Sequence, residues 1–237
     1  MVSDYFYYVL WLLAHTVVAL ITQTRDVYLL VYNRLLRGDK LPQLRKLPQH
    51  LTVLLPSSPP TSPASTNSKH LDILVNLVLW SLATNIQYVS FYDPLGLLVK
   101  WEDELMKRIQ SRMNKSQRLI WHGANTTGKN GFAGPKVHVK ILSAGRAALV
   151  DACRQLSHTE QVLTVPIISK HLLTNYEFPD PQLAIYFGEY LNLCGYPPWQ
   201  IRLTEFIHAG RHLHAFDERE FFSVLQFYSK CQQRVGK

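Results

Sequence analysis

Residues 51–92 decide the fold, and they read LTVLLPSSPPTSPASTNSKHLDILVNLVLWSLATNIQYVSFY. Residues 51–55 form a short apolar run bounded by prolines, which is typical of a buried strand. In residues 56–69, 11 of 14 are Pro, Ser or Thr, which predicts a flexible loop. Residues 70–84 are apolar on nearly every side and long enough for a buried helix, and residues 87–92 alternate like a second strand. The stretch therefore predicts a strand, a helix and a strand.

The same alternation continues along the rest of the chain. Strands that alternate with helices predict an α/β fold whose central, mostly parallel sheet is flanked by helices. We expect helices at residues 102–113 and 146–156, strands at 137–142, 162–165 and 183–187, and a mobile loop with four glycines at 122–135.

A last helix is expected near the end of the chain. Asp217, with Glu220 three residues later, predicts a capping box at its start. The apolar side chains that follow at helical spacing would form its buried face. They are Phe221, Val224, Leu225 and Tyr228.

Composition limits the classes of protein to which the chain can belong. Apolar residues make up 47% of its 237 residues and charged residues 18%, so most of the chain should fold. Lys and Arg outnumber Asp and Glu by 25 to 17, which suits an anionic partner. The three cysteines, Cys153, Cys194 and Cys231, contain no Cys-x-x-Cys and indicate neither a disulfide framework nor a cysteine-rich zinc site. A reducing compartment fits best.

The N-terminus predicts a membrane anchor. Residues 5–24 carry no charged side chain, and residues 5–21 (YFYYVLWLLAHTVVALI) are almost wholly apolar. About 20 helical residues cross a hydrocarbon core of about 30 Å. The alternatives are a buried core helix or a cleaved signal peptide, but Asp4 precedes the run and no small-residue cleavage site follows it. We expect residues 1–24 to be an uncleaved, single-pass transmembrane helix.

Residues 25–46 form a basic segment directly after this anchor. Because Lys and Arg accumulate on the cytoplasmic side of a membrane helix, we expect the domain at residues 47–237 to face the cytosol. The segment is also amphipathic, so it could lie on anionic lipid or pack its apolar side on the domain. Its cations are Arg25, Arg34, Arg37, Lys40, Arg45 and Lys46.

The residues by themselves reveal no strong catalytic motif. There is no P-loop, no His-Glu-x-x-His and no Gly-x-Ser-x-Gly. His208, His212 and His214 are spaced as His-x-x-x-His-x-His, which could ligate zinc. Without a carboxylate or cysteine at matching spacing, we interpret them as polar surface histidines.

Two segments carry a family resemblance: YFGEYLNLCGYPPWQIRLTE at residues 186–205, and the terminal RVGK at 234–237. They resemble the Nogo-B receptor family, the non-catalytic subunits of eukaryotic dehydrodolichyl diphosphate synthase complexes, and more distantly the cis-prenyltransferases. The resemblance covers the anchor and nearly everything from Lys46 to Lys237, weakly over residues 100–135. It implies a cis-prenyltransferase-like fold.

Departures from the active enzymes are as informative. Their first strand is followed by His-x5-Asp-Gly-Asn-x-Arg, whose Asp supports the Mg²⁺ and the diphosphate of the allylic substrate. Here His50 stands at the His position, but Pro56 replaces the Asp. Proline offers neither a metal ligand nor an N–H for a phosphate oxygen.

A second family motif, Arg-x-Ser/Gly-Gly-Glu-x-Arg-Leu-Ser, aligns on residues 186–194. Its two diphosphate-binding arginines become Tyr186 and Asn192, and its Ser becomes Cys194. Losing both guanidinium forks removes most of the anchoring for an isoprenoid diphosphate. Glu205 keeps the position of a metal-linked carboxylate, and we interpret it as a structural remnant.

The terminal Arg-x-Gly remains intact. By itself such an end is usually frayed, but in this family one subunit lends it to the active site of its partner. Arg234 would offer a guanidinium fork to a diphosphate, and Gly236, without a Cβ, would let backbone N–H groups approach the same oxygens.

The resemblance thus implies an endoplasmic-reticulum-anchored subunit of a heteromeric cis-prenyltransferase, inactive alone. Its partners would be the catalytic subunit, which mainly holds the Mg²⁺, isopentenyl diphosphate at the shared site, and membrane lipid. The complex would extend farnesyl diphosphate to the dehydrodolichyl diphosphate used for dolichol and glycosylation. The alternatives are a membrane receptor or scaffold without chemistry and a self-sufficient prenyltransferase. A nucleic-acid partner is not expected, because the basic excess lies beside the anchor.

Overall fold

The structure is a computed structural model in which the chain divides into two compact units, Met1–Pro42 and Gln43–Lys237. In the first unit Tyr7, Trp11 and Thr16 are described, and all three are helical. Within the described part of the chain, no helix combines the length and apolar character needed to cross a membrane. The rest of the predicted anchor lies outside the described residues, as does the basic segment before residue 44. The described ranges of the second unit are 44–56, 65–123, 134–143, 145–158, 162–176, 178–193, 195–210 and 212–232.

Six parallel strands form the centre of the second unit, in the order β3-β4-β2-β1-β5-β6. The strands are β1 (His50–Leu54), β2 (Tyr88–Tyr92), β3 (Arg118–His122), β4 (Lys136–Leu142), β5 (Leu183–Tyr186) and β6 (Glu205–His208). The helices are α2 (Ser65–Ala83), α3 (Glu102–Arg112), α4 (Gly145–Ser157), α5 (Val165–Tyr176) and α6 (Glu218–Lys230), with 3-10 turns η1 (Leu98–Trp101), η2 (Gln200–Leu203) and η3 (Leu213–Ala215).

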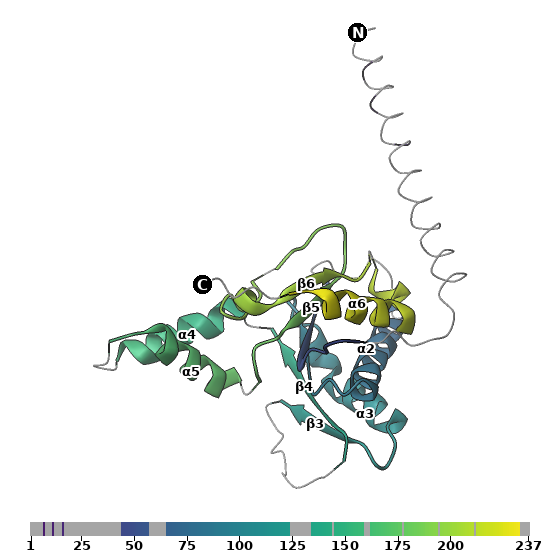
Figure 1. The fold of residues 1–237 in the computed structure, drawn as a ribbon, viewed down its shortest axis with the longest axis horizontal. Coiled ribbons are helices and arrows are strands. Elements are labelled where there is room, and N and C mark those ends of the chain that lie inside the picture. The colour runs from purple at the N-terminus through teal and green to yellow at the C-terminus, as the bar shows by residue number, and fades with distance from the viewer. Residues whose placement is uncertain are drawn as a thin grey trace. The chain divides into compact units, whose positions relative to one another are not determined.

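Helices α2, α3 and α6 cover one face of the sheet (Figure 1). Helix α2 is apolar on most sides because it contacts the strands, α3, η3 and α6 at once. Val53 of β1, Leu77 of α2 and Leu105 of α3 are each 0% exposed in this core. A smaller cluster of Leu54, Tyr92, Ala184 and Tyr196 packs on the other face.

Helices α4 and α5 pack on each other and extend away from the sheet (Figure 1). Gly145, the first residue of α4, lies so close to the backbone of residues 195–197 that an added Cβ would be 1.9 Å from the carbonyl oxygen of Gly195. The start of α4 therefore packs directly on the backbone of residues 195–197, and only a residue without a Cβ can approach so closely.

The structure confirms the parallel sheet and the capping box, in which the Asp217 side chain accepts from Glu220 N at 2.9 Å. The strand predicted at residues 162–165 is wrong. Val162 and Leu163 precede a helix and are 83% and 46% exposed, and Pro166 occupies the first turn of α5. Pro suits a first helical turn because its missing N–H has no partner there, whereas a short apolar run alone does not distinguish strand from helix.

Candidate functional site

The strand order points to one place for a ligand. β1 is flanked by β2 on one side and by β5 on the other. Strands β2 to β4 all lie on the first side and β5 and β6 on the second, so the strand order reverses at β1. In parallel sheets, ligands bind beyond the carboxyl ends of the strands at such a reversal. We therefore take the carboxyl edge between β1 and β5 as the candidate site.

Pro56 and Tyr186 lie at this edge. Pro56 follows β1 and is exposed, while Tyr186 is the last residue of β5 and is half-buried. The Tyr186 ring is 5.2 Å from the ring of His208, the last residue of β6. Asn192 is exposed in the following loop, and Cys194 lies outside the described residues. Pro56 and Tyr186, two of the four replaced family positions, thus lie at the ends of neighbouring strands, where they carry no charge.

The loops after β5 and β6 are closed onto each other. Gly188 N donates to the carbonyl oxygen of Gly210 at 3.1 Å, and His208 Nε2 donates to the carbonyl oxygen of Gly188 at 2.7 Å. Both glycines have positive φ, +105° and +101°, which suits residues without a Cβ. These backbone groups therefore bind one another instead of pointing toward a ligand.

Asp93 is the buried carboxylate at this edge, and sequence analysis missed it. It follows β2, is 3% exposed, and accepts from Leu95 N at 3.0 Å and from Leu98 N at 2.5 Å. Both carboxylate oxygens therefore hold the turn that leads into η1. The Asp-Pro-Leu-Gly at residues 93–96, a typical turn sequence directly after a strand, is the signal that predicts this role.

His50 lies at the opposite, amino end of β1. Its Nδ1 donates to the carbonyl oxygen of Pro179 at 2.7 Å, and its Nε2 lies 2.9 Å from Ser90 Oγ. Burial lowers the pKa of His50 to about 4, against a smaller effect of the Pro179 bond. A neutral histidine beside a serine resembles a nucleophile pair, but His50 and Ser90 are both 0% exposed. With no access for a substrate, the pair is a structural link between β1 and β2.

The structure separates the three histidines of the His-x-x-x-His-x-His pattern. His208 binds Gly188, whereas the rings of His212 and His214 stack 5.1 Å apart. The His214 ring also lies 6.3 Å from that of His70 in α2, and burial, followed by the charge of His214, lowers the pKa of His70. Across the described ranges, no group of three or more His, Cys, Asp or Glu could hold a metal ion.

Mg²⁺ therefore does not fit the described residues of the candidate site. Pro56 and Tyr186 supply no hard anionic oxygen, and both oxygens of Asp93 accept from backbone N–H groups. Glu205 begins β6, so it lies at the amino edge of the sheet beside Leu183 in register. Arg234 and Gly236 lie outside the described residues.

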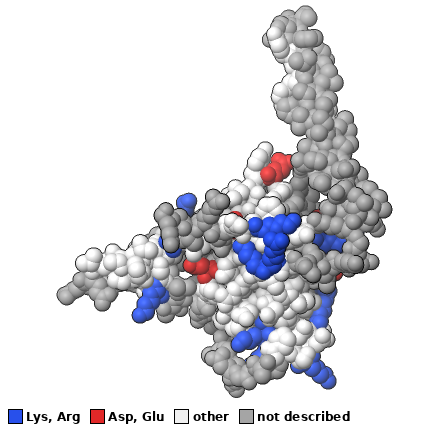
Figure 2. Space-filling view, viewed as in Figure 1, with Lys and Arg blue, Asp and Glu red and all other residues white. Residues whose placement is uncertain are grey.

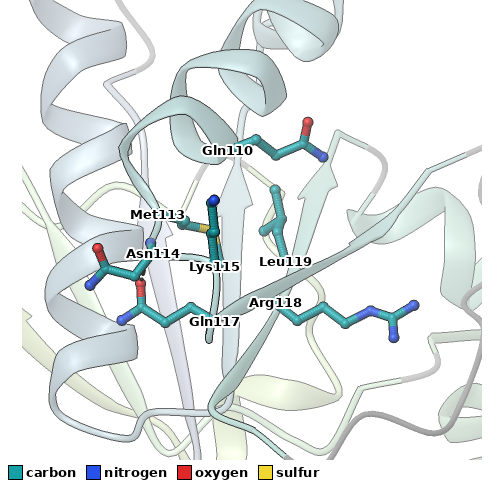
Figure 3. Close-up of a pocket in the computed structure, with 7 residues that line it drawn as sticks. All are labelled: Gln110, Met113, Asn114, Lys115, Gln117, Arg118 and Leu119. Carbon is teal, nitrogen blue, oxygen red and sulfur yellow. Dashed lines mark hydrogen bonds between the residues drawn. The ribbon is translucent and has the colours of Figure 1, made fainter.

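A pocket of about 350 Å³ lies at the junction of α3 and β3. Figure 3 shows Lys115 between Met113 and Leu119, with Gln110 on one side of them and Arg118 on the other. Because β3 begins at Arg118, the pocket lies at the amino edge of the sheet. It is therefore separate from the candidate site.

The sequence model of a family described as "Putative undecaprenyl diphosphate synthase" matches residues 102–236. Proteins named dehydrodolichyl diphosphate synthase complex subunit Nus1 are similar: the Mus musculus protein is 31% identical over 209 residues, covering 82% of this chain and 67% of its own. The Homo sapiens protein is 31% identical over 212 residues, covering 82% and 68%.

Two solved structures share the fold. Lavandulyl diphosphate synthase from Lavandula x intermedia, in complex with dimethylallyl diphosphate, has a TM-score of 0.60 at 16% identity, with 80% of this chain and 98% of that one covered. A probable undecaprenyl diphosphate synthase from Campylobacter jejuni has a TM-score of 0.56 at 15% identity, with 81% and 100% covered.

Proposed function

The chain belongs to the undecaprenyl diphosphate synthase-like prenyltransferase family, and on this premise we propose that it is the non-self-sufficient subunit of a heteromeric cis-prenyltransferase. The complex makes dehydrodolichyl diphosphate from farnesyl diphosphate and isopentenyl diphosphate, for dolichol synthesis and protein glycosylation. Relatives at 31% identity carry the name of such a complex subunit, which supports the assignment.

One observation carries the proposal. At the carboxyl edge of the sheet, where the strand order reverses, the chain keeps the strands of the family fold but lacks the charged residues of the family. Pro56 follows β1 and Tyr186 ends the neighbouring β5, and the buried carboxylate of Asp93 is held by two backbone N–H groups. A diphosphate needs cationic forks or free N–H groups there. The chain therefore depends on a partner for the metal and for the allylic substrate.

The contribution of this chain to the reaction is its C-terminal tail. Arg234 binds the diphosphate of isopentenyl diphosphate at the site shared with the partner, and Gly236 lets backbone N–H groups approach the same oxygens. The Mg²⁺ is held mainly by the catalytic partner. These roles carry over from the family resemblance of the terminal Arg-x-Gly.

The α4–α5 pair offers a surface that suits that partner. Large apolar side chains are exposed on it and directly before α5: Val150 is 46%, Val162 83%, Leu163 46% and Val165 54% exposed. Apolar side chains clustered outside the core mark an interaction site. We expect Val162→Asp together with Leu163→Asp to abolish co-purification of the two subunits, with Val99→Asp, 49% exposed before α3, as the matched control.

Residues 1–24 anchor the chain in the endoplasmic reticulum membrane as a single pass, and the domain at 47–237 faces the cytosol. Asn114 of the sequon Asn114-Lys115-Ser116 is exposed, so burial would not protect it from glycosylation. Because the glycosylation machinery is lumenal, Asn114 and Asn125 of the second sequon both stay unmodified when the domain is cytosolic. An endoglycosidase-sensitive glycan on either asparagine would contradict this orientation and place the domain in the lumen.

Purification with and without the partner tests the proposal. The chain should be isolated from membranes alone and as a complex, and both should be assayed for elongation of farnesyl diphosphate. We expect activity only in the complex. Mg²⁺-dependent elongation by the partner-free chain would instead favour a self-sufficient enzyme.

A further inference from the structure

The last turn of α6 is the point from which the C-terminal tail leaves the domain. Tyr228 lies in this turn and is 3% exposed. Cys231 caps the helix, and its N–H donates to the carbonyl oxygen of Tyr228 at 3.0 Å. Residues 233–237 follow directly. Tyr228 and Cys231 therefore form the last described contact of the domain before the tail.

Lys46 reaches this turn from the other end of the chain. Its Nζ lies 4.5 Å from the centroid of the Tyr228 ring, a distance typical of a cation–π contact. A cation beside the last turn of a helix also suits the negative end of the helix dipole. Figure 2 shows a group of Lys and Arg side chains on the face where Figure 1 places α6.

Glu205 brings an opposite charge to the same place. Burial raises the pKa of Tyr228, and the charges of Glu205 and Cys231 raise it further. Burial likewise raises the pKa of Cys231, Glu205 adds to the rise, and Lys46 opposes it. Lys46 and Glu205 thus flank the end of α6 with opposite charges, one from the segment before β1 and one from the start of β6.

We propose that Lys46 is a positioning residue for the C-terminal tail. Stacked on Tyr228, it holds the last turn of α6 and so limits fraying of the helix end to which the tail is attached. It also ties that helix end to the segment that precedes β1. The inference rests on the proposed function, in which the tail enters the partner's site.

The expected size of the effect depends on how accurately the tail must be placed. Helix ends fray unless they are held, and a misplacement of about 1 Å at a reacting site can lower a rate by about 100-fold. A looser last turn leaves the tail intact but more often misplaced. We expect loss of the Lys46 contact to lower the turnover of the complex by about 3- to 30-fold. The KM for farnesyl diphosphate, which the partner binds, should not change.

The experiment uses the full chain in complex with its partner. Lys46→Met keeps the length of the side chain without its charge, Lys46→Arg keeps the cation, and Arg45→Met is the matched control on the neighbouring exposed residue. Steady-state kinetics and hydrogen exchange of peptides from residues 221–232 are measured for each. We expect Lys46→Met to speed exchange in this segment alone and to lower turnover, Lys46→Arg to restore most of both, and Arg45→Met to resemble the wild type.

Three results would overturn the inference: wild-type exchange and turnover in Lys46→Met, faster exchange across β1 and α2 as well, or no rescue by Lys46→Arg. Arg234→Ala measured in parallel separates this inference from the function on which it rests. If Arg234→Ala lowers turnover and Lys46→Met does not, the tail acts but Lys46 does not position it. If Arg234→Ala is silent, the proposed function fails, and the positioning role fails with it.

Discussion

The carboxyl and amino edges of the parallel sheet differ in what their side chains bind. At the carboxyl edge, Asp93 binds backbone N–H groups of its own loop, His208 binds a backbone carbonyl of the loop after β5, and Pro56 and Tyr186 carry no charge. At the amino edge, Lys46 and Glu205 gather around the end of α6. Helix α6 runs from the first edge to the second and carries the tail.

This difference indicates how a prenyltransferase fold can persist without a complete site. At the carboxyl edge, Asp93 and His208 are satisfied by backbone groups of the same edge. Charged side chains lie instead around the end of α6, the helix that precedes the tail to which we assign a role in the partner's site. Four changes test the contrast, in order of decreasing expected effect.

The largest effect is expected in the tail. Arg234→Ala or Gly236→Ala should lower the turnover of the complex by about 10- to 1000-fold, because a charge-assisted contact to a buried diphosphate contributes about 2 to 4 kcal/mol in the transition state. Subunit association should be unchanged. Steady-state kinetics and co-purification of the assembled complex measure both.

Two further substitutions refine this test. Arg234→Lys should rescue only partly, since an ammonium lacks the planar fork. Lys237→Ala should be mild, because that side chain lies outside the Arg-x-Gly. Wild-type kinetics for both Arg234→Ala and Gly236→Ala would favour the receptor or scaffold role.

At the carboxyl edge, Gly145→Ala should destabilise the fold by about 3 kcal/mol or more, because the new Cβ would overlap the backbone of Gly195 and Pro197. Gly188→Ala is the comparison, since a Cβ there meets nothing within 4 Å and only the positive φ opposes it. We expect it to cost about 1 to 2 kcal/mol. Denaturant unfolding of the full chain in detergent measures both, and equal losses would contradict the close packing.

At the amino edge, His50 makes stability depend on pH. Its pKa is lowered to about 4 by burial, so below pH 6.5 the unfolded chain takes up a proton that the folded chain refuses. Stability should therefore fall as the pH falls, by about 2 kcal/mol from this residue between pH 7 and pH 5. His50→Asn should remove that part of the slope in unfolding free energies measured at the two pH values. An unchanged slope would mean that the fold does not lower the pKa of His50.

The smallest effect is expected at the start of α6. Asp217→Ala removes the acceptor for Glu220 N and should cost about 1 kcal/mol of unfolding free energy. Turnover of the complex should stay near wild type, because the far end of the helix holds the tail. Glu218→Ala, in the same turn but outside the capping box, is the control.

Local sequence signals were reliable where the chain satisfies itself nearby. The capping box at Asp217 and the strand, helix and strand of residues 51–92 depend on neighbours in sequence, and the structure confirms them. The loop predicted at residues 56–69 is wrong at its end, because α2 begins at Ser65. The strands β3 and β6 were not predicted, because their short runs are recognisable only beside β4 and β5. Helix α5 was missed for a different reason: its apolar start resembles a strand.

The sequence by itself determined the parallel α/β class, the family, and the loss of charge at Pro56, Tyr186 and Asn192, because residue type alone decides whether a side chain can bind a diphosphate. Only the tertiary structure decided that both oxygens of Asp93 are occupied, that Glu205 lies away from the candidate site, and that Lys46 stacks on Tyr228. These relations join residues from different strands and helices. They depend on strand order and register, which no local pattern encodes.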